Sequence, residues 1–414
     1  MLSLQDNELL TRTGADSSMG RLMRRYWLPV MLSSELPAPD SPPRRVRVLG
    51  EDLVGFRDTN GRLGLLAEHC SHRGTSLLYG RNEECGLRCI YHGWKYDVDG
   101  NVLDTPAEPA GSKLGLKVQH TAYPCHEVAG LIWAYMGPKE HLPLFPSYLF
   151  TKVPPENVWV TKSVLECNYL QGLEGEVDSA HLSFLHKEWG AGSTDDRQGL
   201  FQQDTTPAYE IEETDFGLRL VALREAGPGE QYVRVTSFVM PVTCWINGRG
   251  TKAPHIYVPI DDTHTWRFDM GVLDRPATAA DASRAQEIGP DFHRVRNASN
   301  DYLQDRERQR TSDFTGIAVF LNQDAAATES MGPLADRSAE HLGVSDRGVI
   351  ALRRYLLSTL RAFTDGGEPP HQVTDPRQND MRHIDTIAEV IPAAEHWRDH
   401  FPHLLQGHSQ GHRP

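Results

Sequence analysis

The sequence predicts an α+β protein in which a small antiparallel β unit precedes a larger unit that combines a long sheet with helices. Over residues 44–137, short alternating apolar runs are separated by turn pairs such as Asn60-Gly61, which suit tight hairpins. Residues 209–272 contain long β runs, and residues 348–363 repeat apolar side chains at helical spacing. These three observations together define the fold class.

A Pro-rich run before residue 44 predicts a domain boundary. We therefore expect an N-terminal segment (1–43) that belongs to the larger domain, a β domain (44–150) and a larger C-terminal domain (151–414). Within the larger domain, residues 168–186 and 279–311 are predicted to be helical.

The composition is typical of a soluble globular protein, with 39% hydrophobic and 24% charged residues in 414. The net charge of −14, spread without long runs, argues against a nucleic-acid or anionic-membrane partner. The N-terminus lacks a basic segment followed by an apolar one, and no apolar stretch approaches the roughly 18 residues of a membrane span. Six cysteines in such a chain predict thiols or metal ligands in a cytoplasmic protein rather than disulfides.

One cysteine and one histidine occur close together twice in the β unit. Cys70 and His72 are separated by one residue, and Cys89 and His92 by two. A structural zinc site usually takes both cysteines from one loop and both histidines from the other. Mixed loops instead fit a Rieske [2Fe-2S] centre, in which one iron binds both thiolates and the other both imidazoles. We expect these four residues to hold such a cluster, with zinc as the weaker alternative and Cys85 as a non-ligand.

A second metal-binding pattern lies within residues 168–186. Asp178 precedes His181 by three residues, and His186 follows five residues later. Two imidazoles and a carboxylate leave about half of an octahedron open. Histidines five apart lie roughly 140° apart on a helix, so both can face one metal only if the helix breaks or carries a π-type bulge. The alternative is an amphipathic helix with two partly buried histidines, and these residues alone leave both interpretations open.

A Rieske pattern followed about ninety residues later by D-x2-H-x4-H resembles the large subunit of the Rieske non-haem iron oxygenases. The stretches RLMRRYWLPV, LEGEVDSAHLSFLH and LNQDAAATESMGPLADRSAEHLG are similar to the phthalate 4,5-dioxygenase branch of that family. The resemblance covers nearly the whole chain. It implies an all-β Rieske [2Fe-2S] domain inserted in a helix-grip catalytic domain, an antiparallel sheet wrapped by helices.

The resemblance also implies the ligands of a mononuclear Fe(II). His181 and His186 would supply the two imidazoles, and Asp324 in the NQD motif would supply the carboxylate. Glu329 and Asp336 are nearby alternatives for the third ligand. Two histidines and one carboxylate with open positions suit an iron that binds O2 beside a substrate.

Asp178 has a different role by this resemblance. It would accept a hydrogen bond from Nδ1 of His181 and contact His72 or His92 of a neighbouring subunit, so that the two metal centres meet across a homotrimer, possibly stacked into a hexamer. For Glu176 in the same stretch, a solvated or capping group and a functional group both remain open.

The strands of residues 209–272 are expected to line the substrate pocket. An alternating strand presents every second side chain to one face, but the sequence does not set the phase. If the substrate is a carboxylate, an arginine or lysine should meet it. The two-arginine clamp for phthalate does not align with this chain, which argues against phthalate itself. The candidate pocket residues are Phe238, Met240, Trp245, Asn247, Arg234 and Arg249.

The expected function is that of a terminal oxygenase component that uses O2 to dihydroxylate or hydroxylate an aromatic, carboxylated compound such as a benzoate, phthalate or phenoxybenzoate. An aryl-ether O-demethylase of the same family is the alternative, and a Rieske electron-transfer protein without oxygenase activity is the rival from another class. No GxGxxG-type nucleotide loop follows a strand, so the chain itself is not expected to bind NADH. The resemblance implies that electrons from NADH arrive through a separate reductase with FMN and a [2Fe-2S] centre.

Overall fold

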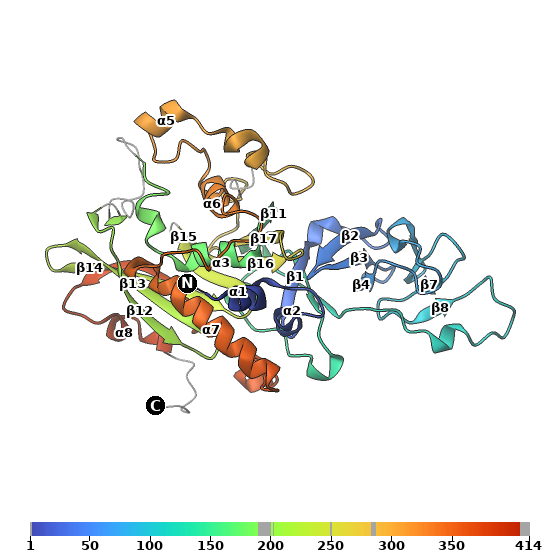
Figure 1. Cartoon of the computed structure of the whole chain (residues 1–414). Helices are drawn as coiled ribbons and strands as arrows, with labels where there is room; N and C mark the ends of the chain where they lie inside the picture. The colour runs from blue at the N-terminus through green and yellow to red at the C-terminus, as the bar shows by residue number, and fades with distance from the viewer. Residues whose placement is uncertain (1, 189–199, 202, 249–250, 283–286, 406–414) are drawn as a thin grey trace.

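Antiparallel sheets dominate the structure, and the largest one carries the helices of the C-terminal domain (Figure 1). This computed structural model describes residues 2–188, 200–201, 203–248, 251–282 and 287–405. Among these residues no helix is both long and apolar enough to cross a membrane.

The large sheet has eight strands in the order β11-β17-β16-β15-β14-β13-β12, with β18 paired to β14. β14 changes partner along its length, since Glu230–Val235 pair with β18 and Ser237–Val239 pair with β15. The predicted long β runs therefore form one continuous antiparallel sheet. Its strands are β11 (Val158–Leu165), β12 (Ala208–Glu213), β13 (Gly217–Gly227), β14 (Glu230–Val239), β15 (Thr243–Gly248), β16 (Thr251–Pro259), β17 (Thr265–Val272) and β18 (Ile387–Pro392).

Three small sheets form the N-terminal third of the chain. Their orders are β1-β10-β9, β2-β3-β4 and β5-β6-β7-β8. The short strands follow from the closely spaced turns that the sequence predicts. Their bounds are β1 (Trp27–Leu32), β2 (Arg44–Val48), β3 (Glu51–Arg57), β4 (Leu63–Ala67), β5 (Arg81–Glu83), β6 (Gly86–Arg88), β7 (Lys95–Tyr96), β8 (Val102–Asp104), β9 (Cys125–Val128) and β10 (Leu131–Tyr135).

Strand alternation divides the interior into two cores at the β2-β3-β4 sheet. Leu53 and Leu65 pack into the main core, whereas their neighbours Val54 and Leu66 pack into a second core that also contains Cys70 and other residues of the small β domain. Successive side chains of a strand point to opposite faces, so one sheet serves both cores. This arrangement joins the small β domain firmly to the larger one.

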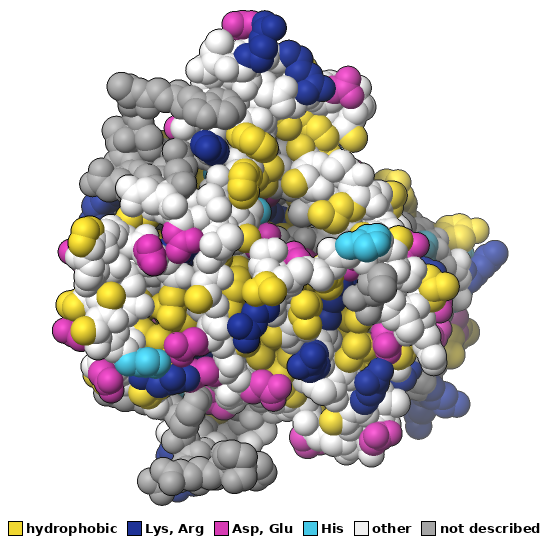
Figure 2. All heavy atoms as spheres, turned by 60° about the vertical axis from the view of Figure 1, so that its left-hand side comes forward, with side chains coloured by type: hydrophobic (Ala, Val, Ile, Leu, Met, Phe, Trp, Pro, Cys, Tyr) yellow, Lys and Arg dark blue, Asp and Glu magenta, His cyan; other side chains and the backbone are white. Residues whose placement is uncertain are grey.

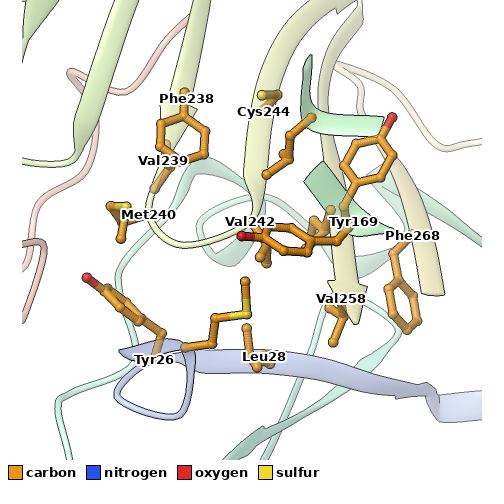
Figure 3. Packing of buried hydrophobic residues seen from close by; sticks show 14 of the residues in the cluster. Tyr26, Leu28, Tyr169, Phe238, Val239, Met240, Val242, Cys244, Val258 and Phe268 are labelled. Carbon is orange, nitrogen blue, oxygen red and sulfur yellow. The ribbon is translucent and has the colours of Figure 1, made fainter. Parts of the chain in front are cut away.

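The helices pack around the large sheet and the N-terminal segment. α1 and α2 contact α7, so the first residues of the chain lie against the C-terminal domain. Figure 3 shows Leu28 of β1 and Tyr169 of α3 pointing into a core shared with Val242 and Val258. The helices are α1 (Leu4–Thr11), α2 (Ser18–Met23), α3 (Tyr169–Val177), α5 (Arg306–Thr311), α6 (Phe320–Glu329), α7 (Arg347–Thr364) and α8 (Trp397–His400).

Two helix predictions need correction. The helix expected over residues 279–311 is wrong, because the described part of that stretch contains only loops, a 3₁₀ segment and the short α5. Polar side chains in this stretch bind backbone amides instead, and the Asn297 side chain accepts a hydrogen bond from the Ser299 amide at the start of the 3₁₀ segment. The helix expected over residues 168–186 ends at Val177, and a 3₁₀ turn at His181–Ser183 follows the break.

Candidate metal centres and catalytic cavity

α3 presents the first part of the iron-binding motif to the large sheet. It begins at Asn168, whose side chain accepts a hydrogen bond from the Leu170 amide at 3.2 Å. Gly172 lies against β16 so closely that a Cβ there would come within 2.3 Å of the Tyr257 ring. The helix therefore needs glycine at this position to approach the sheet.

Tertiary hydrogen bonds pull the chain out of helical geometry directly after α3. The Ser179 amide donates to the Tyr209 hydroxyl at 2.9 Å, and Arg224 donates to the Ser179 hydroxyl at 3.0 Å. Both partners come from neighbouring strands, β12 and β13. This break, rather than a π-type bulge, brings His181 and His186 to the same side, with ring centroids 5.3 Å apart.

His181, His186 and Asp324 form a compact cluster of metal-binding groups. One ligand atom from each of the three lies within 4.8 Å of the other two. Asp324 comes from α6, and its Oδ1 is 3.0 Å from Nε2 of His186. Burial by itself would raise the pKa of Asp324, but His186, Arg267 and His181 hold that pKa well below its ordinary value. The two other carboxylates considered lie elsewhere: Glu329 accepts from the Tyr302 hydroxyl, and Asp336 caps a turn at Ser338.

Two further side chains hold His186 in place. Oε1 of Gln323 accepts from Nδ1 of His186 at 2.7 Å, and its amide nitrogen donates to the Ile317 carbonyl at 3.0 Å. Phe320 stacks on the imidazole with ring centroids 3.6 Å apart. Since Nδ1 is bonded to Gln323, Nε2 remains for a metal. No sequence pattern indicates Gln323 separately, apart from its position beside Asp324.

Asp178 lies at the break, partly open to solvent. Its Oδ1 accepts from the Ala180 amide at 2.7 Å, while Oδ2 is 3.6 Å from Nδ1 of His181, longer than a direct hydrogen bond. Its side chain is 23% exposed, so one face of the carboxylate is available to another molecule.

The two Cys-x-His-type loops of the small β domain face each other. Both cysteines are buried, whereas both histidines are only half-buried. The rings of His72 and His92 have centroids 4.5 Å apart, and His72 stacks on Trp94 at 5.0 Å. Thiols inside and imidazoles toward the surface are the arrangement that a Rieske centre needs.

Each loop closes by similar backbone hydrogen bonds. Gly74 donates to the Cys70 carbonyl at 2.8 Å, and Gly93 donates to the Cys89 carbonyl at 3.1 Å. Both glycines have φ values near +75°, which favour glycine because it lacks a Cβ. Nearby, the Tyr96 hydroxyl is 3.0 Å from Sγ of Cys70.

The chemistry of both donor sets fits iron. Nε2 of His186 is buried with Oδ1 of Asp324 3.0 Å away, and Nδ1 of His92 is buried without a hydrogen-bond partner among the described residues. Burial, together with the neighbouring Cys70, raises the pKa of Cys89. A bound metal would take these buried nitrogens and the two sulfurs as ligands, and it would favour the thiolate form of the cysteines. The sets match a [2Fe-2S] Rieske cluster and a mononuclear Fe(II) in composition.

A cavity of about 260 Å³ opens beside His181 and Asp324. Much of its wall is apolar, and it also contains Arg234, Arg267 and Arg353. Arg267 and Arg353 are bound by carboxylates, respectively by Asp269 and by Glu174 with Glu340. Arg234, whose guanidinium is 3.4 Å from the Asn247 carbonyl, has no carboxylate within ion-pair distance among the described residues. The apolar lining residues include Leu165, Leu182, Leu185, Ile246, Phe320 and Met331.

Of the two interpretations left open for Glu176, its contacts exclude the solvated or capping group. Its Oε1 accepts from the Tyr257 hydroxyl at 2.5 Å and from Nδ1 of His255 at 2.7 Å, with Arg267 at 3.4 Å. Burial would raise the pKa of Glu176, yet His255, Arg267 and Tyr257 lower it below its ordinary value. Strand residues far away in sequence thus make this carboxylate part of the cavity wall.

Most of the predicted pocket residues lie elsewhere. Phe238, Met240 and Trp245 pack in the main hydrophobic core (Figure 3 shows the first two), and this part of the prediction is wrong. Strand β15 directs Ile246 to the cavity, so Asn247 and Trp245 belong to the other face. Arg234 does line the cavity, and Arg249 lies outside the described residues.

Both the small β domain and the C-terminal domain match known protein families. Residues 26–124 match the Rieske [2Fe-2S] domain, and residues 134–409 match the family described as "LigXa C-terminal domain like". The chain is 43% identical to the phthalate 4,5-dioxygenase oxygenase subunit of Pseudomonas putida, over 88% of each chain. It is 35% identical to the 3-chlorobenzoate-3,4-dioxygenase oxygenase subunit of Comamonas testosteroni, over 91% of this chain and 93% of that one.

A solved structure agrees at the level of the fold. Dicamba monooxygenase bound to 3,6-dichlorosalicylic acid superposes with a TM-score of 0.61 at 15% identity, over 83% of this chain and 98% of that one. The expected α+β fold class and the expected family are therefore confirmed. The chain belongs to the Rieske non-haem iron oxygenases with a LigXa-like C-terminal domain, the family of the phthalate 4,5-dioxygenase oxygenase subunit.

Proposed function

We propose that this chain is the terminal oxygenase subunit of a Rieske system that oxidises an aromatic carboxylate with O2. The observation that carries this proposal is a largely apolar cavity that contains His181, Asp324 and one arginine, Arg234, without a carboxylate partner among the described residues. The 43% identity to a phthalate 4,5-dioxygenase oxygenase subunit supports the same substrate class.

In this proposal the small β domain, residues 44–150, carries the cluster, and the rest of the chain carries the iron. The bound cluster supplies single electrons and the bound iron supplies oxygen activation, which no side chain offers. The proposed cluster ligands are Cys70, His72, Cys89 and His92, and the proposed iron ligands are His181, His186 and Asp324.

The side chains of the cavity position the substrate. The apolar wall excludes water and holds an aromatic ring, since burying such a surface is favourable. Arg234 meets the substrate carboxylate, because a guanidinium offers two parallel N–H donors to a carboxylate. The Arg267 guanidinium is already bound by Asp269, so it contributes to the wall and not to substrate recognition.

Electrons would cross between two copies of the chain. Figure 1 shows the cluster-bearing part around β4 and β7 at one end of the molecule, well away from α3 and α6. His72 and His92 are half-buried at that end, and Asp178 is partly exposed at the iron site. We propose a homotrimer in which Asp178 of one subunit meets a cluster histidine of the next. Figure 2 shows small groups of hydrophobic side chains interspersed with charged ones on the face that it presents.

A separate reductase, of the type with FMN and a [2Fe-2S] centre, would supply the electrons in the cytoplasm. The test of the proposal is product analysis with this reductase and a panel of benzoates, phthalates, phenoxybenzoates and methoxybenzoates under ¹⁸O2. Two labelled oxygens in a cis-dihydrodiol indicate dioxygenation, and formaldehyde indicates O-demethylation. If no aromatic carboxylate stimulates O2 consumption, the proposed function is wrong.

Arg234 allows a sharper test of the substrate class. Arg234→Met should weaken binding of the accepted carboxylate about 10- to 100-fold, because a charged hydrogen bond contributes roughly 1.5–3 kcal/mol. Arg234→Lys keeps the charge and should lose less. If both variants bind the substrate like the wild type, Arg234 does not recognise the carboxylate.

A further inference from the structure

Residues 118–123 form an extended strap between strand β4 and the turn after β7. On one side, the Ala67 amide donates to the Thr121 carbonyl at 3.0 Å and the Tyr123 amide donates to the Leu65 carbonyl at 2.9 Å. On the other side, the His120 amide donates to the Gly100 carbonyl at 2.9 Å. These backbone contacts hold the strap firmly at His120.

The His120 side chain reaches the first cluster loop, residues 69–75. It is only 3% exposed, and Nε2 lies 2.9 Å from the Ala67 carbonyl while Nδ1 lies 2.7 Å from the Ser71 hydroxyl. A carbonyl can only accept, so Nε2 carries the hydrogen. Burial lowers the pKa of His120, which favours the neutral ring and leaves Nδ1 to accept from Ser71. Ser71 stands between the proposed ligands Cys70 and His72.

The same imidazole also supports Tyr96. The two rings have centroids 4.5 Å apart, and the Tyr96 hydroxyl is 3.0 Å from Sγ of Cys70. The buried His120 side chain therefore contacts the loop that carries Cys70 and His72. It also contacts Tyr96, whose hydroxyl reaches the sulfur of Cys70. The motifs of the two cluster loops do not include His120, which lies 28 residues after His92.

We propose that His120 is a positioning residue of the Rieske centre, which holds the first cluster loop through Ser71 and holds Tyr96 against Cys70. This inference rests on the proposed cluster ligands. Groups one layer outside the metal orient its ligands, and their loss typically weakens metal binding about 10- to 100-fold. Hydrogen bonds to a cluster sulfur favour the reduced, more negative cluster and so raise the reduction potential.

Two variants separate the contacts. His120→Phe keeps an aromatic ring beside Tyr96 but removes both side-chain hydrogen bonds. Ser71→Ala removes one hydroxyl from an exposed residue, so it tests the contact even if His120→Phe fails to fold. Both variants should lose the cluster to a chelator about tenfold faster than the wild type, with a shifted Rieske EPR signal and a lower reduction potential. The double variant should be no worse than His120→Phe, because the two residues act through one hydrogen bond.

His126→Phe is the matched control. This histidine belongs to β9 in the same part of the chain, and its ring contacts Trp27 and Phe145 rather than a cluster loop. It should leave cluster retention, EPR signal and potential unchanged. The inference is overturned if Ser71→Ala keeps all three wild-type properties, or if His126→Phe changes them as much as His120→Phe. Cys70→Ala distinguishes a failure of the proposed ligands from a failure of the role of His120. If Cys70→Ala retains the Rieske signal, the proposed ligands are wrong. If it loses the signal while Ser71→Ala keeps wild-type cluster retention, EPR signal and potential, only the role of His120 is wrong.

Discussion

Replacing Gln323 by leucine should weaken iron binding although it alters none of the proposed ligands. Gln323 supplies the hydrogen-bond acceptor for Nδ1 of His186 at 2.7 Å, and both residues are buried. Leucine has a similar size but leaves this N–H without a partner, which costs about 1–3 kcal/mol. Each 1.4 kcal/mol corresponds to a factor of ten, so the affinity for Fe(II) should fall roughly 10- to 100-fold.

The assay is an anaerobic titration of iron-free protein with Fe(II) in competition with a chromophoric chelator. It reports metal affinity directly and needs neither substrate nor reductase. Gln323→Glu keeps the acceptor and adds a negative charge near the imidazole, so it should bind Fe(II) at least as tightly as the wild type.

Gln171→Leu is the matched control for general destabilisation. Gln171 is also buried, and its amide nitrogen donates to the Thr328 and Gly332 carbonyls at 2.8 and 3.0 Å. In the part of the chain that the structure describes, Gln171 is not hydrogen-bonded to a proposed ligand, so this variant should lower the free energy of unfolding and leave Fe(II) affinity unchanged. The reasoning is refuted if Gln323→Leu binds Fe(II) like the wild type, or if Gln171→Leu weakens binding equally.

Three further variants test other parts of the account. Asp178→Asn should keep both metals but slow cluster oxidation in single-turnover experiments by orders of magnitude, and a wild-type rate would exclude the bridging role. Tyr96→Phe should lower the cluster potential by on the order of 40 mV in a redox titration, the equivalent of about 1 kcal/mol from the lost bond to Cys70, and an unchanged potential would contradict it. Burial lowers the pKa of His371 to about 4, so the unfolded chain takes up a proton at higher pH than the folded protein. The free energy of unfolding should therefore fall by up to roughly 3 kcal/mol as pH drops from 6.5 to 4, and His371→Asn should show a smaller fall in denaturation experiments at several pH values; an equal fall would exclude His371 as the cause.

Local chemistry made part of the site predictable. The Cys-x-His and Cys-x2-His loops and the Asp178–His181–His186 spacing are short-range patterns, and they specify which atoms could hold a metal before the fold is known. The helix break was foreseen as one of two possibilities, since two histidines five residues apart cannot face one metal on a regular helix. Asp324 came from family resemblance alone, because 138 residues separate it from His186.

Contacts across the large sheet were not predictable in the same way. The phase of β14 and β15 decides that Arg234 and Ile246 line the cavity while Trp245 is in the core, and a shift by one residue would reverse this. The role of Glu176 stayed open in the sequence because its partners His255 and Arg267 are about 80–90 residues away.

The central claim is that one chain holds two separate metal centres through two independent ligand sets. Iron and acid-labile sulfide analysis of purified wild-type protein, Cys89→Ala and His186→Ala tests it directly. We predict about three irons and two sulfides per wild-type chain, about one iron and no sulfide in Cys89→Ala, and about two irons with both sulfides in His186→Ala. A wild-type protein with about two irons that His186→Ala leaves unchanged would contradict the claim.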